Sequence, residues 1–226
     1  MRHAYGRVVR LIVIAKECVP GRVKTRLTPP LSPAEAAALA LVSLQQTLRT
    51  VRSIDVEERV LLLDGDPAAL DTTGFRIEAQ STGRLDERIA AAFDSRSSAA
   101  LLIGMDTPQV SQDILQSIVD DEVADAWFGP ATDGGFWALG LREPHGSLVR
   151  GVPMSQSNTG STQLQRLRGA GLVTRVLPSL TDVDRIDDAV AVSAASPGTP
   201  FALAVESLGL AARNGDAVGA HALAKG

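Results

Sequence analysis

Residues 9–27 read VRLIVIAKECVPGRVKTRL, and the rest of the chain is organised around this stretch. The apolar run from Val8 to Ala15 is long enough for a buried strand and is rich in β-branched residues. Because a glycine lets the backbone approach a ligand and cations neutralise it, the loop that follows suits the binding of phosphate groups. A solvated basic loop is the alternative. The residues concerned are Lys16, Gly21, Arg22, Lys24 and Arg26.

The composition is that of an ordinary globular protein. A chain of 226 residues, 45% hydrophobic and 21% charged, can form one large domain or two small ones with a sizeable core. Its net charge of −4 makes the basic loop a local feature, whereas binding to a nucleic-acid backbone needs a broad positive face. We therefore expect small-molecule partners and no nucleic acid.

Features of the N-terminal region and the single cysteine indicate a cytoplasmic protein. No apolar stretch approaches the roughly 18–20 residues of a membrane span, and charge resumes at Lys16 with no A-x-A-like cleavage site. Cys18 has no partner for an internal disulfide, which fits a reducing compartment. Because Cys18 lies in the basic loop, its pKa could be lowered, or the residue could be incidental.

Apolar runs alternate with helical patterns along the chain, which predicts an α/β fold with a mainly parallel, mixed sheet flanked by helices. A capping box at Ser32 and Glu35 marks the start of the first helix. Residues 1–195 are expected to form this domain, and residues 196–226 a C-terminal helical extension with a frayed tail. The expected strands are 8–15, 59–64, 75–80, 99–104, 125–129, 134–141 and 172–177, and the expected helices are 33–52, 85–95, 111–120, 159–171, 185–195 and 199–213.

Asp106 is the first acidic candidate. It follows the apolar strand at residues 99–104 directly, and Pro108 ends the run, so its carboxylate points into the crevice beyond the sheet. Magnesium prefers one or two carboxylates together with waters and substrate phosphates, and Asp106 opposite the basic loop fits that use. A turn or capping role is the alternative, although Ser111 is the better helix cap.

Asp182 and Asp184 form the second acidic candidate. In an extended segment alternate residues point the same way, so both carboxylates can share one face and complete a metal site with Asp106. The alternative is a pair that caps the helix expected near Arg185, and the two roles can also be divided between them.

The segment GPATDGGFW, residues 129–137, is expected to be a hairpin turn that also faces an acceptor. The acceptor-binding residues are then Asp133, Gly134, Gly135 and Phe136. Ser161 and Thr162, at the start of a helix, can either bind a phosphate or simply cap.

Several familiar enzyme motifs are missing. Val23 and Cys18 stand where a P-loop needs its glycines, and the chain has no G-x-G-x-x-G. A nucleophile-elbow motif for a Ser-His-Asp hydrolase is missing too.

Together these segments resemble the nucleotide-diphospho-sugar transferase, or glycosyltransferase-A-like, superfamily. Within it, the chain is similar to a small bacterial family labelled glycosyltransferase that has radical-SAM or selenium-domain neighbours, and more distantly to 2-phospho-L-lactate guanylyltransferase. The resemblance covers about residues 8–192. It rests on PGRVKTRL with Lys16, on I-G-x-D-x-P at residues 103–108, on G-P-x-x-D-G-G at residues 129–135, on Ser161-Thr162 and on Asp182-x-Asp184.

The chain departs from the family at two points. Residues 83–88 read GRLDER where the family carries G-D-L-G-x-R, and Gly160 stands where the family has an aromatic residue.

The resemblance implies a Rossmann-like glycosyltransferase-A fold and a Mg²⁺ or Mn²⁺ ion held by Asp106 with Asp182 or Asp184. It also implies Lys16, Lys24 and Arg26 as phosphate-binding residues. From the residue patterns we further expect Gly21, Arg22, Arg88, Ser161 and Thr162 to bind nucleotide or phosphate, and Asp106, Asp133 and Lys24 to be catalytic.

The leading hypothesis is a magnesium-dependent transferase that moves a glycosyl group from a nucleoside-diphosphate sugar to a small acceptor. The rival is a guanylyltransferase-like nucleotidyltransferase that joins an NTP to a phosphorylated small acid and releases pyrophosphate. A third hypothesis is a non-catalytic nucleotide-binding scaffold. The oligomeric state stays open, with a homodimer as one option.

Overall fold

The computed structural model of the chain describes residues 8, 10–95 and 97–210. A single seven-stranded sheet runs through this part, in the strand order β3-β2-β1-β4-β6-β5-β7. The strands are β1 (Arg10–Lys16), β2 (Glu58–Asp64), β3 (Arg76–Ala79), β4 (Ala100–Gly104), β5 (Ala126–Pro130), β6 (Phe136–Leu141) and β7 (Thr174–Val176). The α-helices are α1 (Pro33–Arg52), α2 (Leu85–Asp94), α3 (Gln112–Val119), α4 (Thr159–Gly169), α5 (Ile186–Ala195) and α6 (Pro200–Ser207), with 3₁₀ turns η1 (Thr25–Leu27) and η2 (Gly146–Leu148).

The strand order reverses at β1, and this reversal locates the binding edge. The chain passes from β1 outward to β2 and β3, then returns to place β4 on the other side of β1, with all these pairings parallel. Only β6 runs antiparallel to its neighbours β4 and β5. The predicted mixed, mainly parallel α/β sheet is confirmed. In such sheets ligands bind beyond the carboxyl ends of the strands at the point of reversal, which here lies between β1 and β4.

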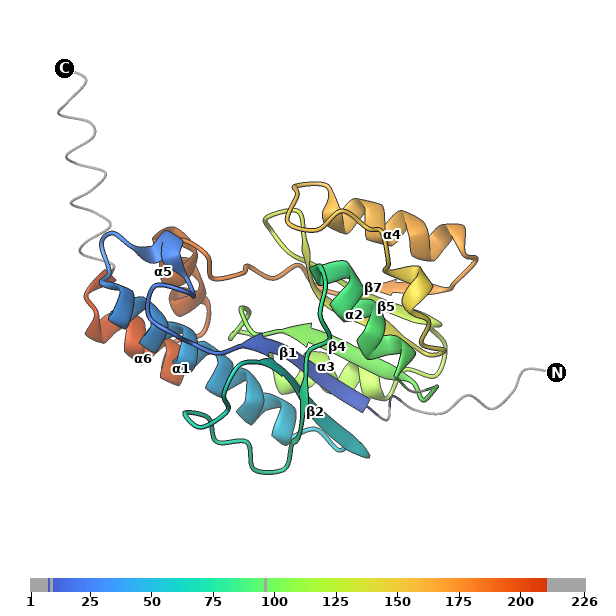
Figure 1. Cartoon of the computed structure of the whole chain (residues 1–226), viewed down its shortest axis with the longest axis horizontal. Coiled ribbons are helices and arrows are strands. Elements are labelled where there is room, and N and C mark those ends of the chain that lie inside the picture. The colour runs from blue at the N-terminus through green and yellow to red at the C-terminus, as the bar shows by residue number, and fades with distance from the viewer. Residues whose placement is uncertain (1–7, 9, 96, 211–226) are drawn as a thin grey trace, which may run out of the picture.

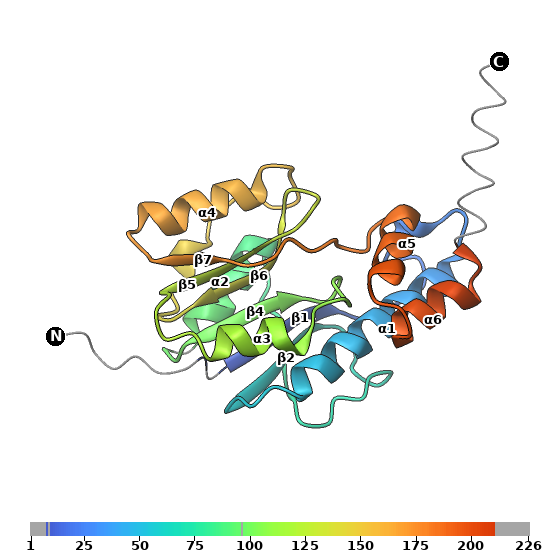
Figure 2. The same cartoon turned by 180° about the vertical axis from the view of Figure 1, so that it is seen from behind.

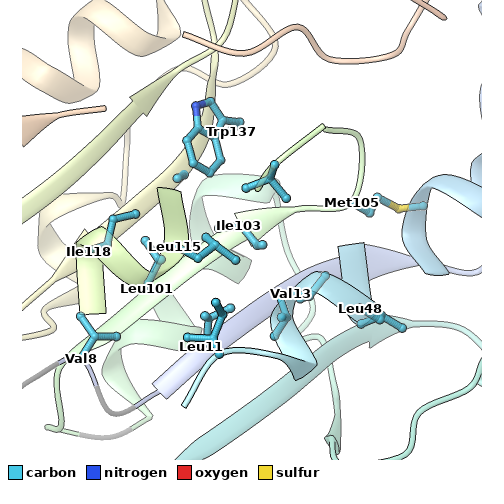
Figure 3. Packing of buried hydrophobic residues seen from close by; sticks show 14 of the residues in the cluster. Val8, Leu11, Val13, Leu48, Leu101, Ile103, Met105, Leu115, Ile118 and Trp137 are labelled. Carbon is cyan, nitrogen blue, oxygen red and sulfur yellow. The ribbon is translucent and has the colours of Figure 1, made fainter. Parts of the chain in front are cut away.

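Helices cover both faces of the sheet (Figures 1 and 2). One face packs on α1 and α3 through a cluster that includes Leu48, Leu115 and Trp137. Figure 3 shows side chains of this cluster interdigitating between strands β1 and β4 and the helices. The opposite face packs on α2 and α4 around Phe93 and Leu167. Because central strands bury both faces, β1 and β4 read as continuous apolar runs.

A third hydrophobic cluster lies at one end of the molecule, where α6 packs against both α1 and α5 (Figure 1). Leu27 at the end of the basic loop and Val183 just before α5 are both buried in it, 0% and 2% exposed. Phe201 of α6 is fully buried in the same cluster. This cluster therefore joins the basic loop, residues 16–27, to the segment that carries Asp182 and Asp184.

Local signals placed most element boundaries within a few residues. The Ser32–Glu35 capping box is present, with the Ser32 amide donating to the Glu35 carboxylate at 2.7 Å. The predicted antiparallel hairpin is β5–β6. The last helix is predicted to run on to Arg213, but α6 ends at Ser207, and Gly209 just beyond it adopts the left-handed conformation that terminates helices. Residues 211–213 of that prediction and the predicted frayed tail lie outside the described residues.

None of the helices in the described part of the chain is long and apolar enough to cross a membrane.

Candidate active site

A pocket of about 750 Å³ opens at the carboxyl edge of the sheet. Its walls come from the end of β1, the basic loop, the turn after β4, the β5–β6 hairpin, the loop before α4 and the segment before α5. Most of the residues predicted from sequence line this one pocket. They are Lys16, Lys24, Arg26, Arg88, Asp106, Asp133, Gly135, Phe136, Asp182 and Asp184.

Five predicted residues lie elsewhere. Gly21 lines a separate cavity of about 130 Å³ together with Val23, Thr25, Thr28 and Pro33. Arg22, Gly134 and Thr162 are not among the residues that line the large pocket, and nor is Ser161, whose hydroxyl donates to the Asn158 carbonyl oxygen at 2.9 Å. From the same helix start, Thr159 reaches the pocket.

Two ion pairs join the basic loop to the acidic edge, which we define as Asp106, Asp133, Asp182 and Asp184. Lys24 Nζ lies 2.7 Å from Asp106 Oδ1, and the Lys24 side chain is only 7% exposed. Arg26 pairs with Asp184, and both side chains are well exposed. Lys24 itself sits in the left-handed region, with φ 49°, a conformation that costs free energy for a residue with a side chain. The cations and aspartates predicted from separate motifs therefore meet directly.

Helix α1 holds the turn that carries Asp106. Ser43 donates to the Met105 carbonyl oxygen at 2.9 Å, and Gln46 donates to the Pro108 carbonyl oxygen at 2.7 Å. Both side chains are buried. On the other side, the Val183 amide donates to the Asp106 carbonyl oxygen at 2.9 Å. The backbone of Asp106 is therefore fixed from two directions, which fixes where its carboxylate enters the pocket.

Asp182 is the most buried member of the acidic edge. Burial first, and then the negative charges of Asp133, Asp106 and Asp184, raise the pKa of Asp182 to about 7, while Lys24 acts in the opposite direction. Asp182 and Asp184 were alternatively expected to cap α5. In the structure Asp188 does this, accepting from the backbone N–H of Arg185 at 2.7 Å.

The oxygen atoms at the acidic edge suit a hard divalent cation. Among the residues that the structure describes, Asp182 Oδ1 is buried without a hydrogen-bond partner, and the only described partner of the buried Asp106 Oδ1 is Lys24 Nζ. Thr107 Oγ1 is a third buried oxygen with no partner in this part of the chain. Within the described residues no group of three His, Cys, Asp or Glu side chains is ready to hold a metal ion. Two carboxylates completed by water and phosphate oxygens match the preference of Mg²⁺.

The hairpin presents Asp133 to the pocket in a fixed turn. Asp133 Oδ1 accepts from the Gly135 amide at 2.7 Å. Gly134 has φ 91°, and a Cβ there would lie 2.1 Å from the Ser157 carbonyl oxygen. A Cβ at Gly160 would lie 2.4 Å from the Gly135 carbonyl oxygen. The hairpin and the start of α4 thus approach each other at backbone distance, which leaves no room for an aromatic side chain at position 160.

Other pocket residues carry no motif and were not predicted. The loop before α4 contributes Met154, Ser155, Gln156 and Ser157. Gln80 at the end of β3 bridges the Ala15 and Leu62 carbonyl oxygens at 2.6 and 3.2 Å, and its own side-chain oxygen accepts from Arg88. The only sequence signal for these residues is their place after a strand or before a helix, which many loop residues share.

Of the two alternatives for Cys18, the lowered pKa is wrong. Burial and the charge of Asp106 outweigh Lys24 and Lys16, and the pKa of the thiol rises to about 11. Cys18 is therefore a neutral thiol at ordinary pH.

A crystal structure of a candidate nucleotide-diphospho-sugar transferase from Desulfovibrio desulfuricans G20 is 26% identical, with a TM-score of 0.78, and the match covers 89% of this chain and 96% of that one. The class of fold is therefore that of nucleotide-diphospho-sugar transferases, as the motifs predicted.

More distant structures share the fold alone. Rv0371c from Mycobacterium tuberculosis H37Rv is 21% identical with a TM-score of 0.55, and the match covers 81% of this chain and 97% of that one. A cytidylyltransferase from Leptospira borgpetersenii is 12% identical with a TM-score of 0.53, covering 89% and 94%. The family model described as "Uncharacterized protein conserved in bacteria" (DUF2064) matches residues 47–156. No curated protein matches the chain.

Proposed function

We propose that the chain is a metal-dependent glycosyltransferase that transfers a sugar from a nucleoside diphosphate to a small acceptor. The observation that carries this proposal is the meeting of the basic loop and the acidic edge in one pocket at the strand reversal, through Lys24–Asp106 and Arg26–Asp184. The likeness to the Desulfovibrio protein supports the choice of a sugar donor.

The basic loop would bind the donor diphosphate. Lys16 is exposed at the end of β1, lines the pocket, and forms no ion pair with any residue that the structure describes, so it is available to a phosphate at once. Lys24 and Arg26 would exchange their aspartate partners for phosphate oxygens. Asp106 and Asp182, with Asp184 nearer the solvent, would hold Mg²⁺ or Mn²⁺, which would supply positive charge to the leaving diphosphate.

Asp133 would act on the acceptor. One of its carboxylate oxygens accepts from the Gly135 amide, and the residue lines the pocket, where the carboxylate would serve as a base or an orienting group. In the reaction the acceptor oxygen forms a bond to the anomeric carbon, the bond from that carbon to the diphosphate breaks, and the acceptor proton passes to Asp133.

A nucleotidyltransferase is the second candidate, and the number of cations favours it. Lys16, Lys24 and Arg26 with Arg88 could neutralise the triphosphate of an NTP while pyrophosphate leaves.

A thermal-shift panel separates the candidates. The protein is heated with MgCl₂ and UDP- or GDP-sugars, or with GTP or CTP. A ligand at 100 times its dissociation constant adds about 2.7 kcal/mol, which raises the melting temperature measurably. A response to a nucleotide sugar is the expected result. A response confined to an NTP would favour the nucleotidyltransferase, and silence across the panel would overturn both candidates.

A further inference from the structure

The pocket has a second wall, whose chemistry differs from that of the basic loop and the acidic edge. Six apolar side chains form it, from β1, α2, β4, β6 and the loop before α4, and all belong to or pack against the cluster on the α2–α4 face of the sheet. They are Ile14, Leu85, Ile89, Leu102, Phe136 and Met154. Four of them are only partly buried, so the core of this face opens into the pocket instead of being covered by polar side chains. Below, this surface is called the apolar wall.

Polar groups without partners stand beside the apolar wall. The side chains of Ser155, Gln156 and Ser157 line the pocket, and none of them forms a hydrogen bond with any residue that the structure describes. Ser155 has φ 59°, a strained conformation for serine. The loop is held in this shape by Thr159, whose hydroxyl donates to the Pro153 carbonyl oxygen at 2.7 Å and accepts from the Gln156 amide at 3.1 Å.

Charge is distributed unevenly around the pocket. On the apolar wall the one cation is Arg88, and its guanidinium already contacts Gln80 at 2.8 Å and Asp64 at 3.6 Å. The remaining cations lie on the basic loop and at Arg185, on the side of the acidic edge. An anionic group placed between the apolar wall and the acidic edge would meet the carboxylates of Asp133 and Asp182. Lys16, Lys24 and Arg26 would already be engaged by the donor diphosphate, so this charge pattern disfavours a phosphorylated acceptor.

The size of the pocket limits the acceptor as well. Small-molecule sites span about 300–1,000 Å³, and here about 750 Å³ must hold both the donor and the acceptor. The acceptor is therefore small.

We propose that the acceptor is an uncharged small molecule with a compact apolar or aromatic group next to its hydroxyl groups. The apolar group packs on the apolar wall, and the hydroxyls bond to Ser155–Ser157 while one of them faces Asp133. This inference rests on the proposed function and names its second substrate class.

The test compares neutral probes that differ in one apolar group. Binding of phenyl β-D-glucopyranoside, methyl β-D-glucopyranoside and glucose 6-phosphate is measured by calorimetry with MgCl₂, with and without UDP or GDP. An added apolar group raises the affinity of a ligand for an apolar pocket roughly tenfold or more. The phenyl glucoside should therefore bind at least about tenfold more tightly than the methyl glucoside. Glucose 6-phosphate should bind most weakly.

Variants tie the preference to the apolar wall. Met154→Gln should remove most of the phenyl preference, while Met154→Leu should keep it. Leu203→Gln is the matched control, since it makes an apolar-to-polar change on α6 at an exposed position outside the pocket.

The outcomes separate this inference from the proposed function. Equal affinity for the two glucosides, tighter binding of glucose 6-phosphate, or no glucoside binding at the solubility limit would overturn the inference, even with UDP or GDP bound. If the protein binds the phenyl glucoside more tightly than the methyl glucoside but binds neither UDP nor GDP, the proposed function would be overturned and the apolar subsite would stand.

Discussion

The contact between the basic loop and the acidic edge has a buried inner end at Lys24 and an exposed outer end at Arg26, two residues further along the loop. At the inner end the Lys24 side chain is 7% exposed and faces Asp106, which is 41% exposed. At the outer end Arg26 and Asp184 are 65% and 40% exposed. Both are contacts between a cation of the loop and a carboxylate at the edge of the sheet, yet the cost of breaking them differs.

The difference follows from solvation. A buried ammonium that loses its counter-ion must be stabilised by something else, whereas an exposed guanidinium is hydrated at once. Lys24 therefore stays at the acidic edge until an equivalent negative charge, such as a diphosphate, replaces Asp106. Arg26 can change partners at little cost. We infer that Arg26 captures a donor and that Lys24 stabilises its leaving group.

The largest effect is expected from Asp106→Asn. Lys24 loses its counter-ion, so the free energy of unfolding should fall by about 1–3 kcal/mol, less than for a fully buried pair because Asp106 is partly exposed. Metal-dependent donor binding should be lost. Urea unfolding and calorimetry with MgCl₂ measure the two effects.

The double variant Lys24→Met with Asp106→Asn is the control for the first prediction. It should recover stability without recovering donor binding. If the Asp106→Asn variant alone were as stable as the natural chain, Lys24 would not be held by Asp106.

Asp182→Asn tests the inner end through pH. A carboxyl whose pKa is raised from 3.8 to about 7 keeps its proton in the folded state after the unfolded chain has lost it. The unfolded state then binds fewer protons, so stability should decline as pH rises from about 4 to 7. Asn stays neutral, and the variant should be more stable at pH 8, by about 1–2 kcal/mol. If the free energy of unfolding declined between pH 4 and 7 as steeply in the variant as in the natural chain, the prediction would be contradicted.

Arg26→Ala tests the outer end. An exposed pair contributes about 0–1 kcal/mol, so unfolding should hardly change. Donor affinity should fall by about tenfold at low salt and less at high salt, because the lost contact is a screened charge–phosphate interaction. Calorimetry at two salt concentrations measures this. Arg168→Ala, an exposed cation on α4, is the matched control and should leave affinity unchanged.

The smallest effect is expected from Ser161→Ala. Its hydroxyl donates to the Asn158 carbonyl oxygen and does not line the pocket. Donor affinity should stay within about twofold, and stability should fall by no more than about 1 kcal/mol. A large loss of affinity would restore Ser161 as the phosphate ligand that its motif predicted.

The sequence predicted which strand ends form the site better than it predicted which side chains pair with one another there. Apolar runs such as Ala100–Gly104 locate strands because central strands must be apolar on both faces, and a polar residue next in the chain then falls at the sheet edge. That logic found Lys16 and Asp106. It could not pair Lys24 with Asp106 across eighty-odd residues, since pairing depends on the fold.

Two kinds of information were beyond the sequence. The loop of Met154 to Ser157 reaches the pocket only because α4 packs against the hairpin at backbone distance, and no motif announces that approach. Cys18 was judged by its neighbours in the chain, whereas burial decides its pKa.

The buried positions of Leu27 and Val183 in one hydrophobic cluster have a consequence for the durability of the site. Because the basic loop and the acidic segment are both anchored in this cluster, hydrophobic packing sets the distance between them, and the attraction between their charges does not. Packing does not weaken with ionic strength, whereas charge attraction does. The distance between the basic loop and the acidic segment should therefore be the same in dilute buffer and in concentrated salt. Only the affinity of the site for a charged ligand should fall as the salt concentration rises.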